Sequence, residues 1–288
     1  MAMSNPANPV KPSSLNRPND PNERLCDLIT MLQQQISTLP TTIKTVHPGL
    51  QQLVDEAALV ATNYDSYLTE YSSPALPILQ RMLDRGAEMD WDGLLAKGVT
   101  QFRLIPEMSA GGYEATVLCH FARMAKVKTI LEIGMFTGTT TISLASIPGV
   151  ERVVTLEIEA YLKEHNLPYF EDAGVANKID IRIGDAVTSL DALGKEGTSF
   201  DMVFIDADKP NYKVYFQRVL DLNILAAGGF IAVDNTAYKA SPWAPDAELY
   251  PMGRDIHEFN EIVRNDVRVE EVMIPVRDGV TLIRRKGE

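Results

Sequence analysis

The chain has 288 residues, of which 45% are hydrophobic and 23% charged, so it can bury a substantial core and is not a disordered chain. Its length is compatible with one domain or two. Its 39 acidic residues exceed its 27 basic ones, and the net charge of -12 disfavours nucleic acid and anionic membrane surfaces as partners.

The first hundred residues predict a tail and a set of helices. Residues 1–23 are rich in Pro, Asn and Ser and predict a flexible tail. Residues 24–100 carry apolar side chains at helical spacing, which predicts a helical extension. This extension includes three tyrosines at helical spacing, Tyr64, Tyr67 and Tyr71. We expect them to pack in the core rather than to cover a ligand.

Residues 101–288 predict one α/β domain. Five short, β-branched apolar runs alternate with amphipathic helices, at residues 129–133, 152–156, 179–183, 202–205 and 230–233. This alternation predicts a doubly wound, mostly parallel sheet. Two last runs, 267–276 and 280–285, alternate apolar and polar residues around Asp278-Gly279 and predict an antiparallel hairpin. The sheet is therefore expected to have seven strands.

Two features of the whole chain concern its location. Residues 220–233, the most apolar stretch of the domain, are interrupted by polar residues and are too short to span a bilayer, so we expect no membrane partner. Cys26 and Cys119 lack a second cysteine at a metal-ligand or redox spacing. We therefore expect unpaired thiols in a cytoplasmic protein.

Ligands of open parallel sheets bind beyond the carboxyl ends of the strands, so the strand ends are the first places to search. The first predicted strand leads into Gly134 and Gly138, whose Gly-x-x-x-Gly spacing disfavours pyrophosphate clamping but allows close approach to a nucleoside. Glu157, 23 residues after Gly134, could accept both ribose hydroxyls or be a solvated glutamate. Asp185 could face an adenine amino group or cap a helix.

The strongest local signal combines two neighbouring strand ends. Asp206 follows the fourth predicted strand, and Asp234 with Asn235 follows the fifth. Two carboxylates and a carboxamide form a hard oxygen site that suits Mg²⁺, Mn²⁺ or Ca²⁺ rather than zinc. None of the four histidines has a ligand-like partner spacing. Helix capping would explain one of these acids but not the set, so we favour a metal site.

Lys209 lies three residues after Asp206, close enough to the expected cation for both to act on one oxygen. In a partly dry cleft beside a cation, the charged form of a lysine is disfavoured, which makes it a candidate general base. The alternative is a plain ion pair with Asp208.

Taken in order, these motifs resemble the cation-dependent class I O-methyltransferases that include the caffeoyl-CoA and catechol enzymes. The matching stretches are 132–138, 184–186, 205–212, 234–236 and 278–285. Five parallel strands followed by a hairpin are also typical of class I methyltransferases. The resemblance implies that Asp206, Asp234 and Asn235 bind a divalent cation, most readily Mg²⁺, and that Lys209 is the catalytic base. It places eight residues around S-adenosylmethionine: Glu132, Gly134, Met135, Thr140, Glu157, Asp185, Ala186 and Asp208.

Within this family, the helical extension and the stretches 131–138 and 268–279 resemble most the O-methyltransferases of mycosporine biosynthesis, which convert demethyl-4-deoxygadusol to 4-deoxygadusol. The plant caffeoyl-CoA pattern is only partly kept. Glu114 is present, but the neighbouring acid, glycine and glutamine are not, and Lys239 stands where that group usually has a substrate-contacting Asn. The resemblance also implies a homodimer acting on a small hydroxylated molecule.

Three alternatives remain at this point. A catechol or caffeoyl-CoA type phenolic O-methyltransferase would use the same site. A nicotinamide-dependent oxidoreductase would explain Gly134 and Glu157, although the glycine spacing and the terminal hairpin oppose it. A non-catalytic binding protein would not need Lys209. In each O-methyltransferase reading we expect the loop 238–252 and the helical extension to build the acceptor pocket.

Overall fold

The computed structural model describes residues 20–41, 49–244 and 250–288. Of the tail predicted over residues 1–23, residues 1–19 lie outside the described part of the chain. Asp20 caps the first helix by accepting a hydrogen bond from the Glu23 backbone N–H at 2.8 Å. Helix α1 (Pro21–Ser37) therefore begins three residues before the predicted boundary.

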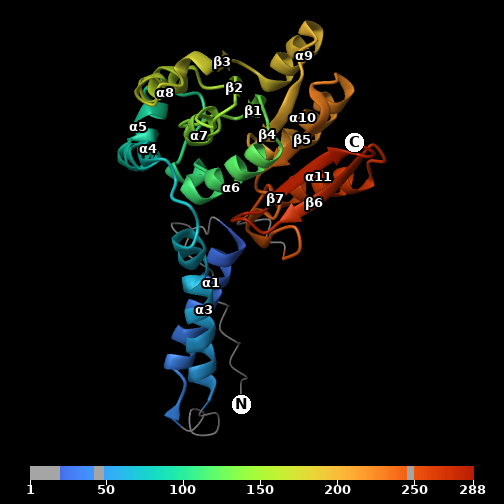
Figure 1. Ribbon diagram of the computed structural model, residues 1–288. Coiled ribbons are helices and arrows are strands. Elements are labelled where there is room, and N and C mark those ends of the chain that lie inside the picture. Colours follow the sequence, from blue (N-terminus) through green and yellow to red (C-terminus); the bar gives the residue numbers. More distant parts are fainter. Residues whose placement is uncertain (1–19, 42–48, 245–249) are drawn as a thin grey trace.

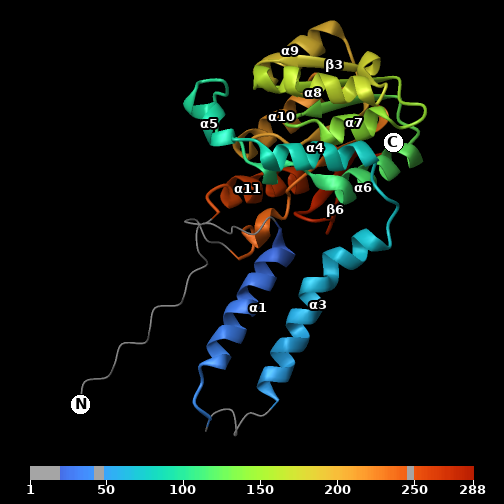
Figure 2. The same ribbon diagram turned by 90° about the vertical axis from the view of Figure 1, so that its left-hand side faces the viewer.

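Two long helices project from the domain as an arm, residues 20–41 and 49–71. Helices α1 and α3 (Leu50–Glu70) lie side by side and point away from the sheet (Figures 1 and 2). Their outer faces are apolar but uncovered. The prediction that the tyrosine stripe packs in the core is wrong, because Tyr64, Tyr67 and Tyr71 are 46%, 60% and 71% exposed. Helical spacing had indicated an amphipathic helix, but the apolar side faces outward on the arm.

The other two helices of the predicted extension belong to the domain itself. Helix α4 (Pro77–Glu88) and helix α5 (Trp91–Ala96) contribute Leu79, Met82 and Trp91 to the main core cluster. The described residues between 24 and 100 are mostly helical, but they do not form one unit: the arm stands apart and α4 and α5 pack on the sheet domain.

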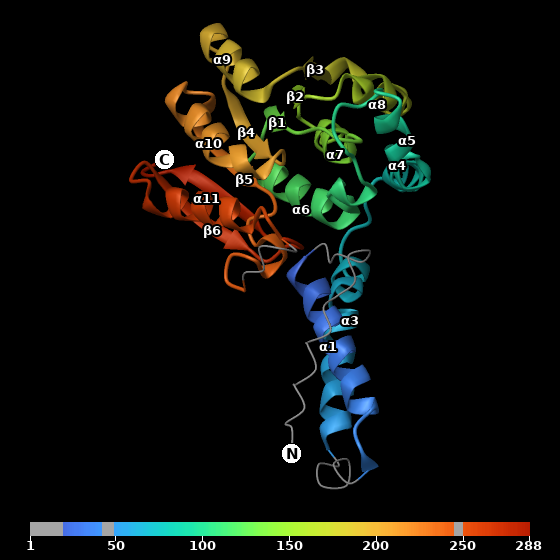
Figure 3. The ribbon, with the colours of Figure 1, turned by 180° about the vertical axis from the view of Figure 1, so that it is seen from behind.

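The sheet has seven strands in the order β3-β2-β1-β4-β5-β7-β6, which confirms the predicted architecture (Figure 3). The first five strands run parallel, and β7 pairs antiparallel with both β5 and β6. The strands are β1 (Thr129–Ile133), β2 (Arg152–Glu157), β3 (Ile179–Ile183), β4 (Phe200–Ile205), β5 (Leu225–Val233), β6 (Val269–Ile274) and β7 (Val280–Arg285).

Helices cover both faces of the sheet because successive strand residues point to opposite sides. In β1, Ile130 belongs to one core cluster and Leu131 and Ile133 belong to the other. The first cluster includes α4, α6 (Gly111–Met124), α7 (Thr139–Ala145) and α8 (Ala160–Asp172). The second includes α9 (Ala186–Glu196), α10 (Tyr212–Asp221) and α11 (Gly253–Asn265). Short 3-10 turns are η1 (Pro106–Met108), η2 (Ala176–Lys178), η3 (Lys209–Asn211) and η4 (Tyr238–Ala240).

None of the described helices is long and apolar enough to cross a membrane. The sheet lies between two layers of helices. The polar carboxyl-terminal ends of its parallel strands therefore lie together at one edge of the sheet, where the candidate functional residues are found.

Candidate active site

A continuous row of backbone hydrogen bonds brings the two predicted cation ligands together. The Asp206 N–H donates to the Ile133 carbonyl at the end of β1, at 2.9 Å. The Asp234 N–H donates to the Ile205 carbonyl at the end of β4, at 3.0 Å. The two aspartates therefore occupy adjacent positions where β4 and β5 end, as the sequence predicted.

Gly134 is required at the start of the turn after β1. Its φ of +97° lies in the left-handed region, and a Cβ there would come within 2.1 Å of the Asp206 carbonyl oxygen. Any side chain at Gly134 would therefore push the Asp206 backbone away. Four residues later, Gly138, with φ +73°, is the N-cap of α7. The glycine pair thus shapes this turn, with Gly134 beside the Asp206 backbone and Gly138 at the start of α7.

Asp234 is a nearly completely buried carboxyl, 2% exposed. Burial first, and the nearby negative charge of Asp206 second, raise its pKa to about 7. Its Oδ1 accepts a hydrogen bond from the Asn235 N–H at 2.6 Å, and Asn235 itself has φ +59°. Neither Asp206 nor Asp234 is the N-cap of a described helix, so capping does not explain this pair.

The Lys209 ammonium lies against Asp206. Nζ donates to Asp206 Oδ1 at 3.0 Å, to the Tyr212 hydroxyl at 2.7 Å and to the Ala207 carbonyl at 3.1 Å. The expected alternative, an ion pair with Asp208, is not formed. Asp208 instead accepts hydrogen bonds from Tyr215 and Asn211.

Two further buried acids that sequence reasoning did not assign to the site face Asp234. Asp278, in the turn between β6 and β7, has its pKa raised to about 8 by burial and then by the charge of Asp234. Glu114, in the first turn of α6, is 2% exposed and has its pKa raised by burial, then by Asp234 and Asp206. Both residues stood out in the sequence, Glu114 as an acid shared with the plant caffeoyl-CoA pattern and Asp278 as part of the hairpin turn. Neither motif showed that its side chain would lie near Asp234.

The donor set fits a divalent cation. Asp234, Asp278 and Glu114 are buried and Asp206 is half-buried. These four acids interact electrostatically with one another, and the nearby bases include Lys209 and Arg277. Such an excess of buried acid is stabilised by a bound cation. In the described part of the chain no three His, Cys, Asp or Glu side chains are arranged as a metal shell.

Glu157 is tied to the glycine turn. Its Oε2 accepts hydrogen bonds from the backbone N–H groups of Met135 and Phe136, at 3.1 and 2.9 Å. Its Oε1 accepts one from Glu159 at 2.8 Å. It is 7% exposed, so the solvated alternative does not hold. A carboxylate has about four lone-pair sites, so these three hydrogen bonds leave one of them, on Oε1, for a ribose hydroxyl rather than the two that the sequence suggested.

Glu132 lies deeper, in the core between β1 and α7. Its Oε2 accepts hydrogen bonds from Thr141 and Thr155, the latter at 2.6 Å, and its Oε1 has no partner. Burial raises its pKa to about 8. Glu132 is 0% exposed, and its hydrogen bond with Thr141 connects β1 to α7.

The remaining predicted cofactor residues gather at the same edge of the sheet. Met135 and Thr140 are buried in the turn after β1 and the start of α7. Asp185 caps α9 by accepting hydrogen bonds from the N–H and hydroxyl of Thr188, at 2.7 and 2.8 Å, so its capping alternative holds. Ala186 follows it as the first residue of α9, and Asp208 is the N-cap of η3.

Arg24 connects the arm to the loop after β5, a contact that the sequence did not predict. Its Nη1 donates to the carbonyl oxygens of Lys239 and Ala244, both at 2.9 Å, and its guanidinium lies 4.7 Å from the centre of the Tyr250 ring. The two segments expected to build the acceptor pocket are therefore in direct contact.

The known proteins that this chain resembles identify its family. The sequence model of a family described as O-methyltransferase matches residues 72–286. The chain belongs to this O-methyltransferase family. The match begins after the arm, includes α4 and α5, and covers every strand. The predicted enzyme class is confirmed, and the nicotinamide-dependent alternative is set aside.

Relatives and solved structures agree with this O-methyltransferase assignment. Caffeoyl-CoA O-methyltransferase 1 of Eucalyptus globulus is 38% identical over 187 residues, which are 62% of this chain and 75% of the relative. The Pinus taeda caffeoyl-CoA O-methyltransferase is 39% identical, over 62% of this chain and 71% of the relative.

Among solved structures, an SAH-bound O-methyltransferase of Bacillus cereus is 25% identical with TM-score 0.63, over 77% of this chain and 97% of that one. The SAH-bound Podospora anserina methyltransferase PaMTH1 shares the fold, with TM-score 0.68, 23% identity and coverage of 79% and 96%.

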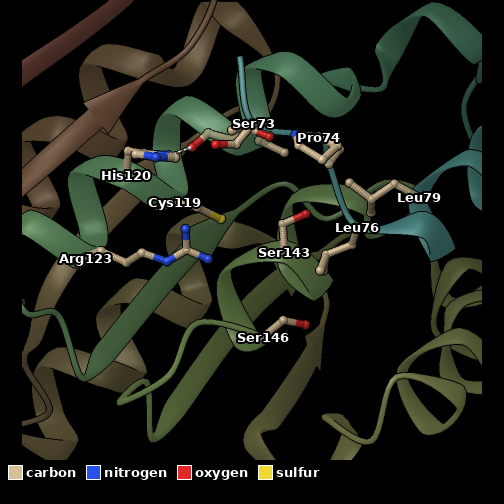
Figure 4. Close-up of a pocket in the computed structure, with 12 residues that line it drawn as sticks. Ser73, Pro74, Leu76, Leu79, Cys119, His120, Arg123, Ser143 and Ser146 are labelled. Atoms are coloured by element: carbon tan, nitrogen blue, oxygen red, sulfur yellow. Dashed lines mark hydrogen bonds between the residues drawn. The ribbon is translucent and has the colours of Figure 1, made fainter. Parts of the chain in front are cut away.

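A separate small pocket of about 80 Å³ lies away from these residues in the O-methyltransferase domain (Figure 4). It is bounded by Ser73 to Leu76 of the connecting segment, by Cys119 and His120 of α6, and by Ser143 of α7. None of the predicted site residues lines it, so it has no place in the chemistry argued below.

Proposed function

We propose that the chain transfers a methyl group from S-adenosylmethionine to one of two vicinal hydroxyls of a small molecule, with a divalent cation, most suitably Mg²⁺. The observation that carries this proposal is the pair of the half-buried Asp206 and the buried Asp234 at adjacent strand ends, with Lys209 held against Asp206.

Asp206, Asp234 and Asn235 would hold the cation. When bound there, a divalent cation lowers the pKa of an acceptor hydroxyl and orients the vicinal pair. The chain's own contribution is positioning: the backbone row through Ile133, Asp206 and Asp234 fixes the spacing of the carboxylates before any ligand arrives. Orientation of this kind accounts for about 7–11 kcal/mol of barrier lowering in favourable cases.

The methyl donor would lie over the turn after β1. Support comes from the solved O-methyltransferases, since the Bacillus cereus enzyme holds SAH and TomG of Streptomyces achromogenes, 26% identical with TM-score 0.61, holds SAM. Gly134 lets the backbone approach the donor closely, and Glu157 keeps one unused acceptor site at the end of β2 for a ribose hydroxyl. Met135, Thr140, Glu132, Asp185, Ala186 and Asp208 would complete its surroundings.

Lys209 would take the proton of the reacting hydroxyl. In the transfer, the acceptor oxygen bonds to the methyl carbon as the carbon–sulfur bond breaks, which yields a methyl ether and S-adenosylhomocysteine. The three hydrogen bonds that Nζ donates are those of an ammonium group. A base role therefore requires Lys209 to give up one proton and one of these bonds before the acceptor hydroxyl donates to it.

For the acceptor we propose demethyl-4-deoxygadusol, converted to 4-deoxygadusol, on the overall similarity to the mycosporine-pathway enzymes. The second candidate is a catechol or caffeoyl-CoA type phenol, which the caffeoyl-CoA O-methyltransferase relatives favour. The net charge of -12 weighs against an acceptor as anionic as a CoA thioester.

The test is a methyl-transfer assay on the three acceptors with and without EDTA. We expect transfer that EDTA abolishes and Mg²⁺ restores, with demethyl-4-deoxygadusol as the fastest acceptor. Transfer that EDTA leaves unchanged would remove the cation from the proposal. Methylation of the catechols alone would establish the phenolic alternative instead.

We further propose that the chain forms a homodimer in the cytoplasm. The dimer rests on the family resemblance and on the uncovered apolar side chains of the arm. The location rests on Cys26 and Cys119, which are both free thiols in the described structure.

A further inference from the structure

Glu114 is a buried carboxyl with an unused acceptor beside the candidate cation ligands. It lies in the first turn of α6, is 2% exposed and forms a hydrogen bond with the Asp234 carboxyl. Its Oε1 is buried and has no hydrogen-bond partner. Asp206 and Arg277 are close enough to shift its pKa in opposite directions.

An unused buried acceptor of this kind is costly, because its hydration is lost and nothing replaces it. The cost is tolerated where a ligand supplies the missing donor. Because Glu114 is hydrogen-bonded to Asp234, a ligand group that donates to Glu114 Oε1 would lie directly beside the carboxylate proposed to hold the cation.

Three kinds of partner could meet Glu114 Oε1, and the surroundings favour one. An anion is repelled, since Asp206, Asp234 and Asp278 are neighbouring acids. A role as a further cation ligand is not prepared, because no three acidic, histidine or cysteine side chains of the described chain are gathered as a metal shell. A neutral hydroxyl, which brings a donor and no charge, satisfies the acceptor without disturbing its hydrogen bond to Asp234.

We propose that Glu114 is a specificity-determining residue that accepts a hydrogen bond from a third hydroxyl of the acceptor, next to the vicinal pair. This inference rests on the proposed function and refines its substrate class: the enzyme selects molecules with three contiguous hydroxyls over simple diols. Sites built to bind a hydroxyl discriminate strongly against analogues that lack it, because the buried polar group is then left unpaired.

The experiment uses the full chain with Mg²⁺ and compares pyrogallol, with three contiguous hydroxyls, against catechol, with two. For the wild-type chain we expect kcat/KM for pyrogallol to exceed that for catechol by about ten- to a hundredfold. Glu114→Gln should keep this preference, because the amide can donate to Asp234 and still present a carbonyl oxygen. Glu114→Met, similar in length but without an acceptor, should abolish it.

Two further measurements separate a specificity role from a structural or metal-ligand role. Mn²⁺ affinity, measured by calorimetry without acceptor, should agree within about threefold between wild type, Glu114→Gln and Glu114→Met. Glu107→Met, the same change at an exposed acid just before α6, is the matched control and should leave the preference intact. Thermal unfolding of each variant checks that it is folded.

Equal kcat/KM for the two phenols in the wild type would overturn the inference while leaving the proposed function intact. A preference that survives in Glu114→Met would also overturn it, and so would a loss of Mn²⁺ affinity in that variant, which would make Glu114 a cation ligand. Failure of methyl transfer to both phenols and to demethyl-4-deoxygadusol would instead reject the proposed function, and the inference with it.

Discussion

Lys209 is the side chain on which the proposed proton transfer depends. Lys209→Ala should lower turnover by about 10²–10⁴-fold, the usual contribution of a positioned acid or base. The affinity for S-adenosylmethionine should stay nearly unchanged, because the Lys209 ammonium contacts Asp206, Ala207 and Tyr212 rather than the turn after β1. Steady-state kinetics and calorimetry measure the two quantities.

The control is Lys213→Ala, which removes a more exposed lysine of the same helix region that pairs with Glu258 at 3.1 Å. Its turnover should match the wild type. A Lys209→Ala variant with equal turnover would refute the base role.

Glu132 should make the stability of the protein depend on pH. Its pKa is about 8 in the folded chain and about 4.5, the usual value of an exposed glutamate, in the unfolded chain. The folded chain therefore holds the proton more tightly than the unfolded one. This contribution is complete below pH 4.5 and is lost as the pH rises through 8. Between pH 6 and pH 8 we expect the free energy of unfolding to fall by on the order of 1–3 kcal/mol.

Glu132→Gln isolates this effect, since a neutral amide can accept the same bonds from Thr141 and Thr155. Urea unfolding at both pH values in EDTA should show a smaller fall for the variant. The same fall in both proteins would mean that Glu132 is not the group responsible.

Site residues were predictable where they share a short stretch of chain with a strand end. Asp206, Lys209 and Asp234 follow strands directly, and parallel strands bring their ends to one edge. Glu114 and Asp278 could not be placed this way, because α6 and the last hairpin reach the site only through long-range packing. Nor does a sequence show that Glu157 accepts two hydrogen bonds from the glycine turn and a third from the Glu159 N–H.

At the scale of the elements, the contact between α1 and the loop after β5 has a direct consequence. Arg24→Ala removes two charge-assisted hydrogen bonds that hold this loop, at Lys239 and Ala244. Because the loop is expected to line the acceptor pocket, KM for the acceptor should rise about tenfold, with little change in the affinity for S-adenosylmethionine.

Arg81→Ala is the matched control, because Arg81 makes only an exposed ion pair with Asp172 in the described structure, at 3.2 Å. Its KM should equal that of the wild type. An unchanged KM in Arg24→Ala would show that the loop keeps its shape without the arm.

Element type was predictable from periodicity, but element placement was not. The spacing of apolar residues is alike in α3, which projects, and α4, which packs in the core. Periodicity records which side of a helix is apolar; it does not record which surface will cover that side. For this reason the seven-stranded sheet was predicted correctly. The sequence did not predict that the helical extension would separate into a projecting arm, α1 and α3, and two helices that pack in the core, α4 and α5.

At the scale of the whole molecule, the arm is the surface most suited to a second copy of the chain. It carries ten of the 24 large apolar side chains that are exposed in the described residues. We expect light scattering to give the mass of a dimer for the wild type, and a monomer for the double variant Leu53→Glu, Val60→Glu. Both side chains are about two-thirds exposed, at 66% and 68%.

Met124→Glu changes a 70% exposed apolar residue outside the arm and should leave the mass unchanged. A dimer that persists in the double variant would place the interface elsewhere, and a monomeric wild type would refute the dimer.

The bond from Arg24 to the Lys239 carbonyl joins residues 215 positions apart, and this separation sets an order of events during synthesis. At about 5–20 residues per second, a ribosome takes on the order of 10–40 s to deliver the second residue after the first. Helix α1 can pair with α3 early, but it must wait for β5 before it finds its docking place. Helix α1 is therefore made early but fixed late, and Arg24 can hold the loop that is expected to line the acceptor pocket only after β5 has been made.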